Sequence, residues 1–387
     1  MSRISIKVGP PVEGDDFYGR EKELSYAWES HISKGTSLLL SAPRRVGKSS
    51  FSKKILKIAE KNKWKTLYLD LEGISTEQEF VKSLKDELQK NAWWENTKGK
   101  IGDTILKILE GIDVLEIAGS KVSFDSTIWR ANTYENIKQL FEKLDETLIV
   151  IDELAVYLNH LLAQESGKEK VEFFLEWLRK FRQTTRSRWI LCSSIGIENF
   201  ASMHQLSKHI NDIKPFSIGA FREDEAEKFI LRLGIDENVL FTSEHIQYIL
   251  DKLVWHLPFF IQLLVEKIKF LICVEDKHLS NETIDEAYNR LVTEGHFNTW
   301  DERLKEYGEL EADTRKILKL CTFPKGKSRK NLLANLSVNT NDIEKIEETL
   351  SRILVLLKND GYLEESNDKY IFRSPLLRDF WYGRFGK

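Results

Sequence analysis

The chain of 387 residues has few of the features that mark secreted or metal-binding proteins. Its three cysteines, Cys192, Cys273 and Cys321, lie far apart and form no CxxC pair. This spacing excludes a disulfide framework and predicts a reducing compartment. The eight histidines show no metal-ligand spacing, and the N-terminal segment MSRISIKVGPP lacks the apolar stretch of a signal peptide. We therefore expect a cytoplasmic protein.

Long hydrophobic runs and an excess of one charge are also missing. The longest apolar region, residues 253–274, is interrupted by His256, Pro258 and several charged residues, so it predicts a core helix and no membrane contact. The formal net charge of -3 provides no general attraction for nucleic acid. With 41% hydrophobic and 31% charged residues, the composition is typical of a folded, largely helical protein.

Strand and helix patterns alternate in the first half of the chain. Short apolar runs occur at residues 36–41, 65–73, 146–158, 187–196 and 213–221. Segments with helical spacing separate them, which predicts an α/β fold with a parallel five-stranded sheet. Residues 113–126 alternate around a Gly-Ser turn and predict a small hairpin.

The pattern changes after residue 222. Helical segments continue to about residue 308, and the remaining chain reads as three helices followed by two short strands, which is the outline of a winged helix. We therefore expect an α/β core over residues 1–222, a helical domain over 223–308 and a winged-helix domain over 309–387.

The segment LLLSAPRRVGKSSF, residues 38–51, is close to the phosphate-binding pattern G-x-x-x-x-G-K-[ST]. An apolar strand precedes it and an amphipathic helix follows, so backbone N–H groups would face a phosphate at a helix N-terminus. Lys48 would reach the β- and γ-phosphates, and the Ser49 hydroxyl would bind Mg²⁺. Ala42 replaces the first glycine, which is tolerable if its φ stays negative. The predicted nucleotide-binding residues are Ala42, Pro43, Arg44, Arg45, Val46, Gly47, Lys48, Ser49 and Ser50.

A second acidic motif completes the predicted site. LIVIDE, residues 148–153, is a hydrophobic strand that ends in two acids. Asp152 is placed to hold Mg²⁺ through water, and Glu153 to activate the water that attacks the γ-phosphate. An ordinary buried strand with a charged end is the alternative. Two halves of one site in the right order favour ATP and Mg²⁺ as cofactors.

Ser193 and Ser194 end the fourth predicted strand, which should lie between the phosphate-loop strand and the Asp152 strand. Two readings are open for these hydroxyls. They could bond the γ-phosphate or the attacking water, or they could cap the next segment.

Together these motifs resemble the AAA+/STAND group of P-loop ATPases, specifically the archaeal-type ATPase branch related to origin-recognition ATPases. The resemblance also includes FREDEAEKF at the start of a helical lid and the terminal KYIFRSPLLRDFWYGRF. FYGREKEL, residues 17–24, resembles the family's box beside the adenine, which implies nucleotide contacts for Tyr18, Gly19 and Arg20. HLPFFIQLL resembles the lid motif whose proline, here Pro258, approaches the base, although His256 replaces its glycine.

Several arginines have two readings. Arg44 and Arg45 could stabilise the γ-phosphate charge or pair with acids of a neighbouring subunit, or they could be solvated. The resemblance implies an arginine finger from a neighbour, for which Arg182, Arg186 and Arg188 are candidates beside the simpler reading as surface residues.

The C-terminal domain carries mixed signals for DNA. PKGKSRK, residues 324–330, is basic, but the helix placed to enter a groove begins with Asp342, Glu344, Glu347 and Glu348 against Lys345. Acids facing a polyanion are unfavourable, so a protein partner or a contact with the ATPase core is favoured over DNA.

Three functions are left open. The first is a slow, regulated ATPase that changes conformation or forms a homo-oligomer to control a partner protein in signalling or defence. The second is an origin-recognition-like ATPase that binds duplex DNA. The third is a nucleotide-binding scaffold with negligible turnover.

Overall fold

The computed structural model describes residues 3–91, 94, 126–144, 146–193, 196–323, 326–336 and 343–386. The hairpin expected over 113–126 lies outside these residues, apart from Ser126 at the start of a helix. The chain forms two compact units. The α/β unit comprises Arg20–Ser41 and Lys48–Ile218, and the helical unit comprises Met1–Gly19, Ala42–Gly47 and Gly219–Lys387. The three-domain division by residue number stays a prediction.

The α/β unit is built on the predicted parallel sheet of five strands. The strands are β1 (Leu38–Ser41), β2 (Lys65–Asp70), β3 (Thr147–Asp152), β4 (Ser187–Ser193) and β5 (Lys214–Ser217). Their order across the sheet is β2-β3-β4-β1-β5. The fourth strand therefore lies between the phosphate-loop strand and the Asp152 strand, as the sequence predicted. All six residues of β3 are buried, which is typical of a strand covered on both faces.

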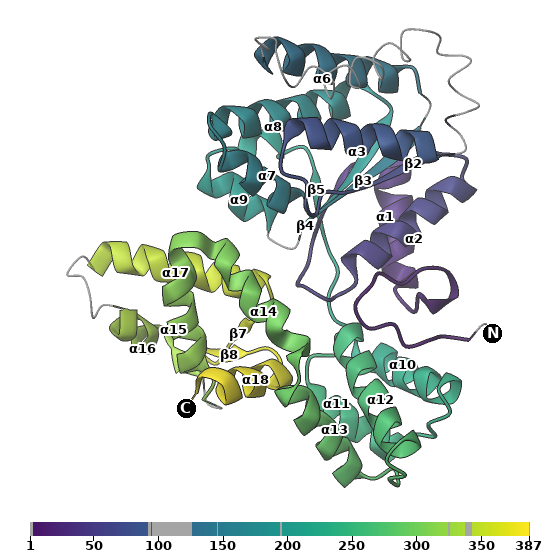
Figure 1. Ribbon diagram of the computed structural model, residues 1–387, viewed down its shortest axis with the longest axis vertical. Coiled ribbons are helices and arrows are strands. Elements are labelled where there is room, and N and C mark those ends of the chain that lie inside the picture. The colour runs from purple at the N-terminus through teal and green to yellow at the C-terminus, as the bar shows by residue number, and fades with distance from the viewer. Residues whose placement is uncertain are drawn as a thin grey trace. The chain divides into compact units, whose positions relative to one another are not determined.

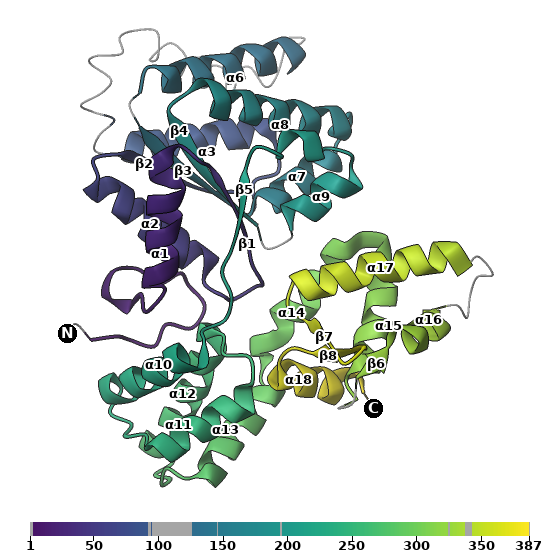
Figure 2. The same ribbon diagram turned by 180° about the vertical axis from the view of Figure 1, so that it is seen from behind.

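Helices cover both faces of this sheet (Figures 1 and 2). One face carries α1 (Glu21–Ser30) and α2 (Lys48–Lys61). The other face carries α3 (Glu77–Lys90), α6 (Ser126–Glu142), α7 (Leu154–Leu162), α8 (Gly167–Thr184) and α9 (Ile197–Met203). The core on this second face is rich in aromatic rings that touch edge to face, among them Phe80, Tyr134, Phe174 and Trp177.

The helical unit begins with a four-helix group. Its members are α10 (Glu223–Asp236), α11 (Ser243–Leu253), α12 (Pro258–Cys273) and α13 (Asn281–Thr293). The N-terminal segment lies along this group, because the Ile4 N–H donates to Asp236 Oδ2 at 2.8 Å and the Lys7 N–H donates to Gln262 Oε1 at 2.8 Å. Most of α12 is buried, so the longest apolar region is the predicted core helix. Among the described residues, no helix is long and apolar enough to cross a membrane.

The C-terminal elements fit a winged helix. They are α14 (Asn298–Arg303), α15 (Glu311–Cys321), β6 (Lys327–Ser328), α16 (Arg329–Leu336), α17 (Ile343–Asn359), β7 (Leu363–Ser366), β8 (Lys369–Phe372) and α18 (Pro375–Phe385). The three strands form an antiparallel sheet in the order β6-β8-β7. Short 3-10 helices occur at Gly14–Asp16, Ile32–Lys34, Ser207–His209, Gly295–Phe297 and Leu304–Leu310.

A buried ion pair anchors the turn that leads into this small sheet. Arg303 Nε donates to Asp360 Oδ2 at 2.9 Å, and both side chains are only 2% exposed. The Tyr307 hydroxyl donates to the same oxygen at 2.7 Å. A buried charge is tolerated when it is paired and hydrogen-bonded, and removing one partner leaves the other uncompensated.

We expect Asp360→Ala to lower the free energy of unfolding of the helical unit by about 3–5 kcal/mol, because Arg303 would be buried without its main counter-charge. Urea unfolding followed by circular dichroism measures the change. Asp313→Ala is the control, since Asp313 pairs with Lys316 at side-chain exposures of 37% and 51% and should lose less than about 1 kcal/mol. Equal losses in the two variants would contradict this reading.

Candidate nucleotide site

The phosphate loop, Ala42–Gly47, connects β1 to α2. Ala42 is buried and keeps a negative φ, so the condition for replacing the first glycine is met. Gly47 has a φ of +96°, and no atom lies within 4 Å of the position that a Cβ would occupy. This left-handed backbone favours glycine, and the open space suits the close approach of a phosphate.

The N-terminus of α2 follows this glycine directly. Lys48 is the first residue of the helix and is 7% exposed. The first N–H groups of a helix have no acceptor within the helix, and the helix dipole makes this end positive. The loop and the start of α2 therefore have the donors and the charge that a phosphate requires.

The Asp152 carboxylate joins the two halves of the site. Ser49 Oγ, on α2, donates to Asp152 Oδ2 at 2.6 Å. The Tyr68 hydroxyl, on β2, donates to the same oxygen at 2.7 Å. Asp152 is 3% exposed, and a buried carboxylate needs such donors. The first turn of α2, the end of β3 and the side chain of Tyr68 on β2 thus meet at one oxygen atom.

Tyr68 is the site residue that the sequence analysis missed. Burial, the charge of Asp152 and the hydrogen bond to it raise the pKa of the Tyr68 phenol far above its usual value, so the phenol stays a neutral donor. The only local signal was a polar aromatic side chain inside a buried strand, KTLYLD. Its contact with Asp152 depends on how two strands pair.

Glu153 follows the strand in a left-handed conformation, with φ 54° and ψ 35°. Its N–H donates to Asp152 Oδ1 at 3.0 Å, and it is the N-cap residue of α7. A residue other than glycine seldom adopts this conformation, and such strain is common where a side chain is aimed for function. Glu153 is half-buried and directly follows Asp152 in the chain.

Ser193 ends β4 next to this region. Its Oγ accepts the Ala155 N–H at 3.3 Å, so the hydroxyl helps hold the start of α7 behind Glu153. This contact is of the capping kind, and the hydroxyl hydrogen can still donate elsewhere. Ser194 lies outside the described residues. Cys192, which precedes Ser193, is fully buried, and burial raises the pKa of its thiol well above the usual value.

The residues expected beside the base gather at the start of α12. The Tyr18 ring contacts Phe221 and Phe229 at centroid distances of 6.2 and 5.0 Å. The Phe221 N–H donates to the His256 carbonyl at 3.0 Å, two residues before Pro258 opens the helix. Gly19, with a φ of +71°, packs under the Phe221 ring. Arg20, the next residue, is buried in the α/β unit near Glu23.

The two loop arginines contact other parts of the helical unit. Arg44 Nη1 donates to the Thr299 carbonyl at 3.3 Å, and Arg45 Nη1 donates to the Gly9 carbonyl at 3.1 Å. The Arg45 guanidinium also lies 4.7 Å from the centre of the Phe259 ring. In this structure neither side chain is simply solvated.

The candidate arginine fingers differ in exposure. Arg182 is buried, and Arg182 Nη2 donates to Asp212 Oδ1 at 2.8 Å. Burial lowers the pKa of its guanidinium below the usual value. Arg188 is half-buried and donates to the Ser187 carbonyl at 3.0 Å. Arg186 is exposed, so it alone of the three is open to a neighbouring molecule.

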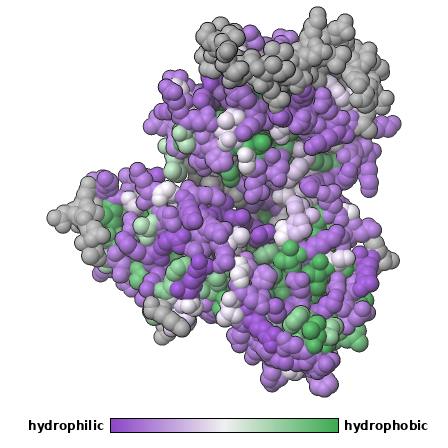
Figure 3. Space-filling view, viewed as in Figure 1, coloured by the Kyte–Doolittle hydropathy of each residue, from purple (hydrophilic) through white to green (hydrophobic). Residues whose placement is uncertain are grey.

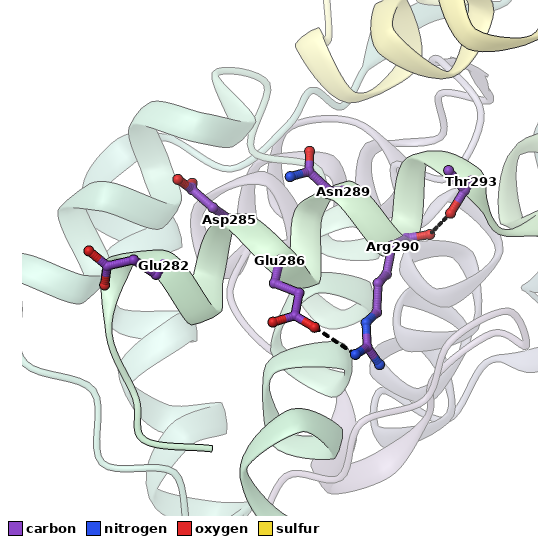
Figure 4. A pocket seen from close by; sticks show the side chains of 6 residues that line it. All are labelled: Glu282, Asp285, Glu286, Asn289, Arg290 and Thr293. Carbon is purple, nitrogen blue, oxygen red and sulfur yellow. Dashed lines mark hydrogen bonds and ion pairs between the residues drawn. The ribbon is translucent and has the colours of Figure 1, made fainter. Parts of the chain in front are cut away.

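A separate groove runs along α13 (Figure 4). Charged side chains of this groove form ion pairs. Arg290 Nη2 lies 2.6 Å from Glu286 Oε1, and Lys252 Nζ, on the adjacent α11, lies 2.6 Å from Asp285 Oδ1. A single helix supplies the whole lining, which consists of Glu282, Asp285, Glu286, Asn289, Arg290 and Thr293. Charges that are already paired indicate a solvated face. None of the predicted site residues lines this groove.

Comparison with known proteins shows a likeness of fold. No family model matches the sequence, and no significant similarity to a curated protein was found. Among solved structures, the Walker-type ATPase PABY2304 of Pyrococcus abyssi is similar over 97% of this chain and 99% of its own, with a TM-score of 0.64 and 18% identity. The Aeropyrum pernix ORC2 protein, in ADPNP and ADP complexes, is similar over 97% and 98%, with a TM-score of 0.57 and 9% identity.

The chain therefore shares the fold of these two solved structures, and the similarity extends over nearly the whole chain. Within this fold, the loop after β1 and the acids Asp152 and Glu153 at the end of β3 lie at the carboxyl ends of two parallel strands that are separated by β4. Open α/β sheets bind their ligands at this edge.

We expect Gly47→Ala to weaken ATP binding by at least about tenfold, because an L-residue at this positive φ costs roughly 1–2 kcal/mol and its Cβ would enter the phosphate space. Isothermal titration calorimetry measures the affinity. Gly219→Ala is the matched control, since Gly219 also has open space around its Cβ position but no positive φ. Equal affinities for the two variants would show that the Gly47 backbone does not form the cradle.

Proposed function

We propose that the protein is a magnesium-dependent ATPase of the AAA+ type. The observation that carries the proposal is the 2.6 Å hydrogen bond between Ser49 Oγ and Asp152 Oδ2, which joins the first turn of α2 to the acidic strand. In the described part of the chain, no three His, Cys, Asp or Glu side chains are arranged so that they could hold a metal ion by themselves. Mg²⁺ suits a site with few protein ligands, since it keeps its waters and binds substrate phosphates.

Each residue has a role that follows from its position. Lys48 and the N–H groups at the start of α2 bind the phosphates. Ser49 directly and Asp152 through water would hold Mg²⁺, which would supply positive charge beside the phosphates. Glu153 orients the attacking water and accepts its proton. Tyr18 and Pro258 contact the base, and Ser193 keeps α7 in place behind Glu153.

Turnover is slow and regulated in this proposal. Both loop arginines bond to carbonyl groups of the helical unit, Arg44 to Thr299 and Arg45 to Gly9. Bonds of this kind support a resting arrangement in which the arginines do not serve the γ-phosphate. Release of these contacts on ATP binding would couple the nucleotide to movement of the helical unit.

The output of the switch is control of a partner protein or of another copy of the chain. Apolar side chains gather on the surface of the α10–α13 group, at the lower right of Figure 3. Exposed members of these elements and their loops are Leu231, Ile235, Leu240, Val254, Phe270 and Val274. Exposed apolar surface is common where proteins bind one another, which supports a protein partner.

We expect Lys48→Ala to abolish ATP binding and Glu153→Gln to bind ATP but hydrolyse it about 10²–10⁴-fold more slowly, because the amide cannot accept a proton. Calorimetry and phosphate release measure the two effects. Glu165→Gln is a control outside the motif. A Glu153→Gln variant with the wild-type rate would refute the assignment of the water-activating carboxylate.

Duplex DNA binding is the second candidate function. It is supported by three basic residues at β6 and α16, which are Lys327, Arg329 and Lys330. Against it, Glu344, Glu347 and Glu348 are exposed on α17 and would face the phosphates. Arg329 is also committed in part, because its Nη2 donates to Ser351 Oγ at 2.6 Å.

We expect duplex DNA to leave the rate of ATP hydrolysis unchanged within about twofold and to bind only at non-specific affinity, with a Kd of roughly 10⁻⁴–10⁻⁶ M. Phosphate release with and without DNA, and fluorescence anisotropy at two salt concentrations, measure this. If DNA stimulates turnover and Lys330→Glu removes the stimulation, the origin-recognition-like reading replaces the partner-protein reading.

A further inference from the structure

Tyr68 lies outside both motifs of the site, yet it bonds to the same carboxylate oxygen as Ser49. The two hydroxyl oxygens lie 2.7 and 2.6 Å from Asp152 Oδ2. We propose that Tyr68 is a positioning residue that orients the Asp152 carboxylate for Mg²⁺ and so sets the magnesium concentration at which the protein works. The inference rests on the proposed ATPase function.

Strand pairing brings Tyr68 to this carboxylate. In the parallel pair of β2 and β3, Tyr68 lies opposite Val150 and Asp70 lies opposite Asp152. Side chains two residues apart share a face of a sheet, so Tyr68 and Asp152 lie diagonally on one face. Such diagonal neighbours are about 7–8 Å apart at their backbones, which only a long side chain spans. A tyrosine at this position fits that distance.

The ring is also held from the helix that carries Ser49. Lys53 Nζ, on α2, lies 5.2 Å from the centre of the Tyr68 ring. A cation over an aromatic ring is attracted to its face, and here it fixes the ring between α2 and β2. The hydroxyl therefore approaches Asp152 from a constrained direction.

The hydrogen-bond geometry makes Tyr68 a donor. Its hydroxyl donates to Asp152 Oδ2 at 2.7 Å, and a carboxylate oxygen accepts such bonds. The Ser49 and Tyr68 hydroxyls donate to Oδ2, while the Glu153 N–H donates to Oδ1 at 3.0 Å. Donors on both oxygens fix the plane of the carboxylate before metal arrives. Fixing it in advance removes an entropic cost from metal binding.

A purely structural role is the competing explanation. In that case the phenol only satisfies a buried carboxylate, and its loss lowers stability without changing the metal requirement. The dependence of hydrolysis on Mg²⁺ concentration separates the two roles.

The test compares Tyr68→Phe with the wild-type full-length chain. We expect the Mg²⁺ concentration for half-maximal ATP hydrolysis to rise about tenfold, the range for losing one hydrogen bond to a charged group. Saturating Mg²⁺ should restore kcat to within about threefold, because Tyr68 does not touch the reacting atoms. ATP affinity in EDTA should stay within about twofold of wild type, since the lost bond serves the metal.

Tyr288→Phe is the matched control. The Tyr288 hydroxyl donates to Asp379 Oδ2 at 2.8 Å, which is the same pair of groups between α13 and α18. This variant should melt at a lower temperature but keep the wild-type Mg²⁺ requirement. If Tyr68→Phe also keeps that requirement, the positioning role is overturned. If the wild-type protein binds no Mg-ATP, the ATPase proposal fails first and this inference fails with it.

A second measurement keeps the hydroxyl at position 68, so it does not depend on whether the Tyr68→Phe variant folds. 3-Fluorotyrosine placed at position 68 keeps the ring and the hydroxyl, and its ¹⁹F resonance reports on the hydroxyl's surroundings. We expect the resonance to shift when Mg²⁺ is added to the ATP-bound protein. An unchanged resonance at saturating Mg²⁺ would overturn the inference.

Discussion

The need to satisfy one buried carboxylate organises the candidate site. Asp152 is almost fully enclosed, and its oxygens receive donors from α2, from β2 and from the backbone that enters α7. A buried ionised group without such donors would be costly. The same hydrogen bonds fix the position of α2 relative to β2 and β3. The geometry of the candidate site and the packing of the sheet therefore depend on the same contacts.

Local patterns in the sequence predicted the parts of this arrangement that are themselves local. Five apolar runs predicted the five parallel strands, and the LIVIDE motif predicted a fully buried strand that ends at Asp152. The apolar runs depend on neighbouring residues, whose spacing the sequence displays directly. The fourth strand was also predicted to lie between the phosphate-loop strand and the Asp152 strand, and the order of the sheet confirms this.

Features that depend on distant pairing were not predicted. The Tyr68 contact exists because β2 pairs with β3 in a particular register, and nothing near Tyr68 indicates that register. Arg182 was considered a surface residue or a finger, but it is buried against Asp212, which lies thirty residues away. The partner of Ser193 is Ala155, on a different element. Each is a tertiary contact, which residue spacing alone does not reveal.

Backbone conformations with positive φ occur in the segments that form the candidate site, as well as elsewhere in the chain. Gly19, Arg20, Arg45, Gly47 and Glu153 all have positive φ. Three of these are not glycine, and each such residue needs surrounding contacts to hold it. Arg45 is held by the Gly9 carbonyl and the Phe259 ring, and Glu153 by its bond to Asp152.

The path of the chain through the two compact units has a consequence for how the protein can be divided. The phosphate loop packs as part of the helical unit, while the strand before it and the helix after it belong to the α/β unit. A fragment that stops at Ile218 would contain every strand of the sheet but would leave Arg44 and Arg45 without Thr299 and Phe259. Neither unit is a continuous stretch of sequence. Synthesis must therefore pass Thr299 before Arg44 can make its contact, which is well after β5 has completed the sheet.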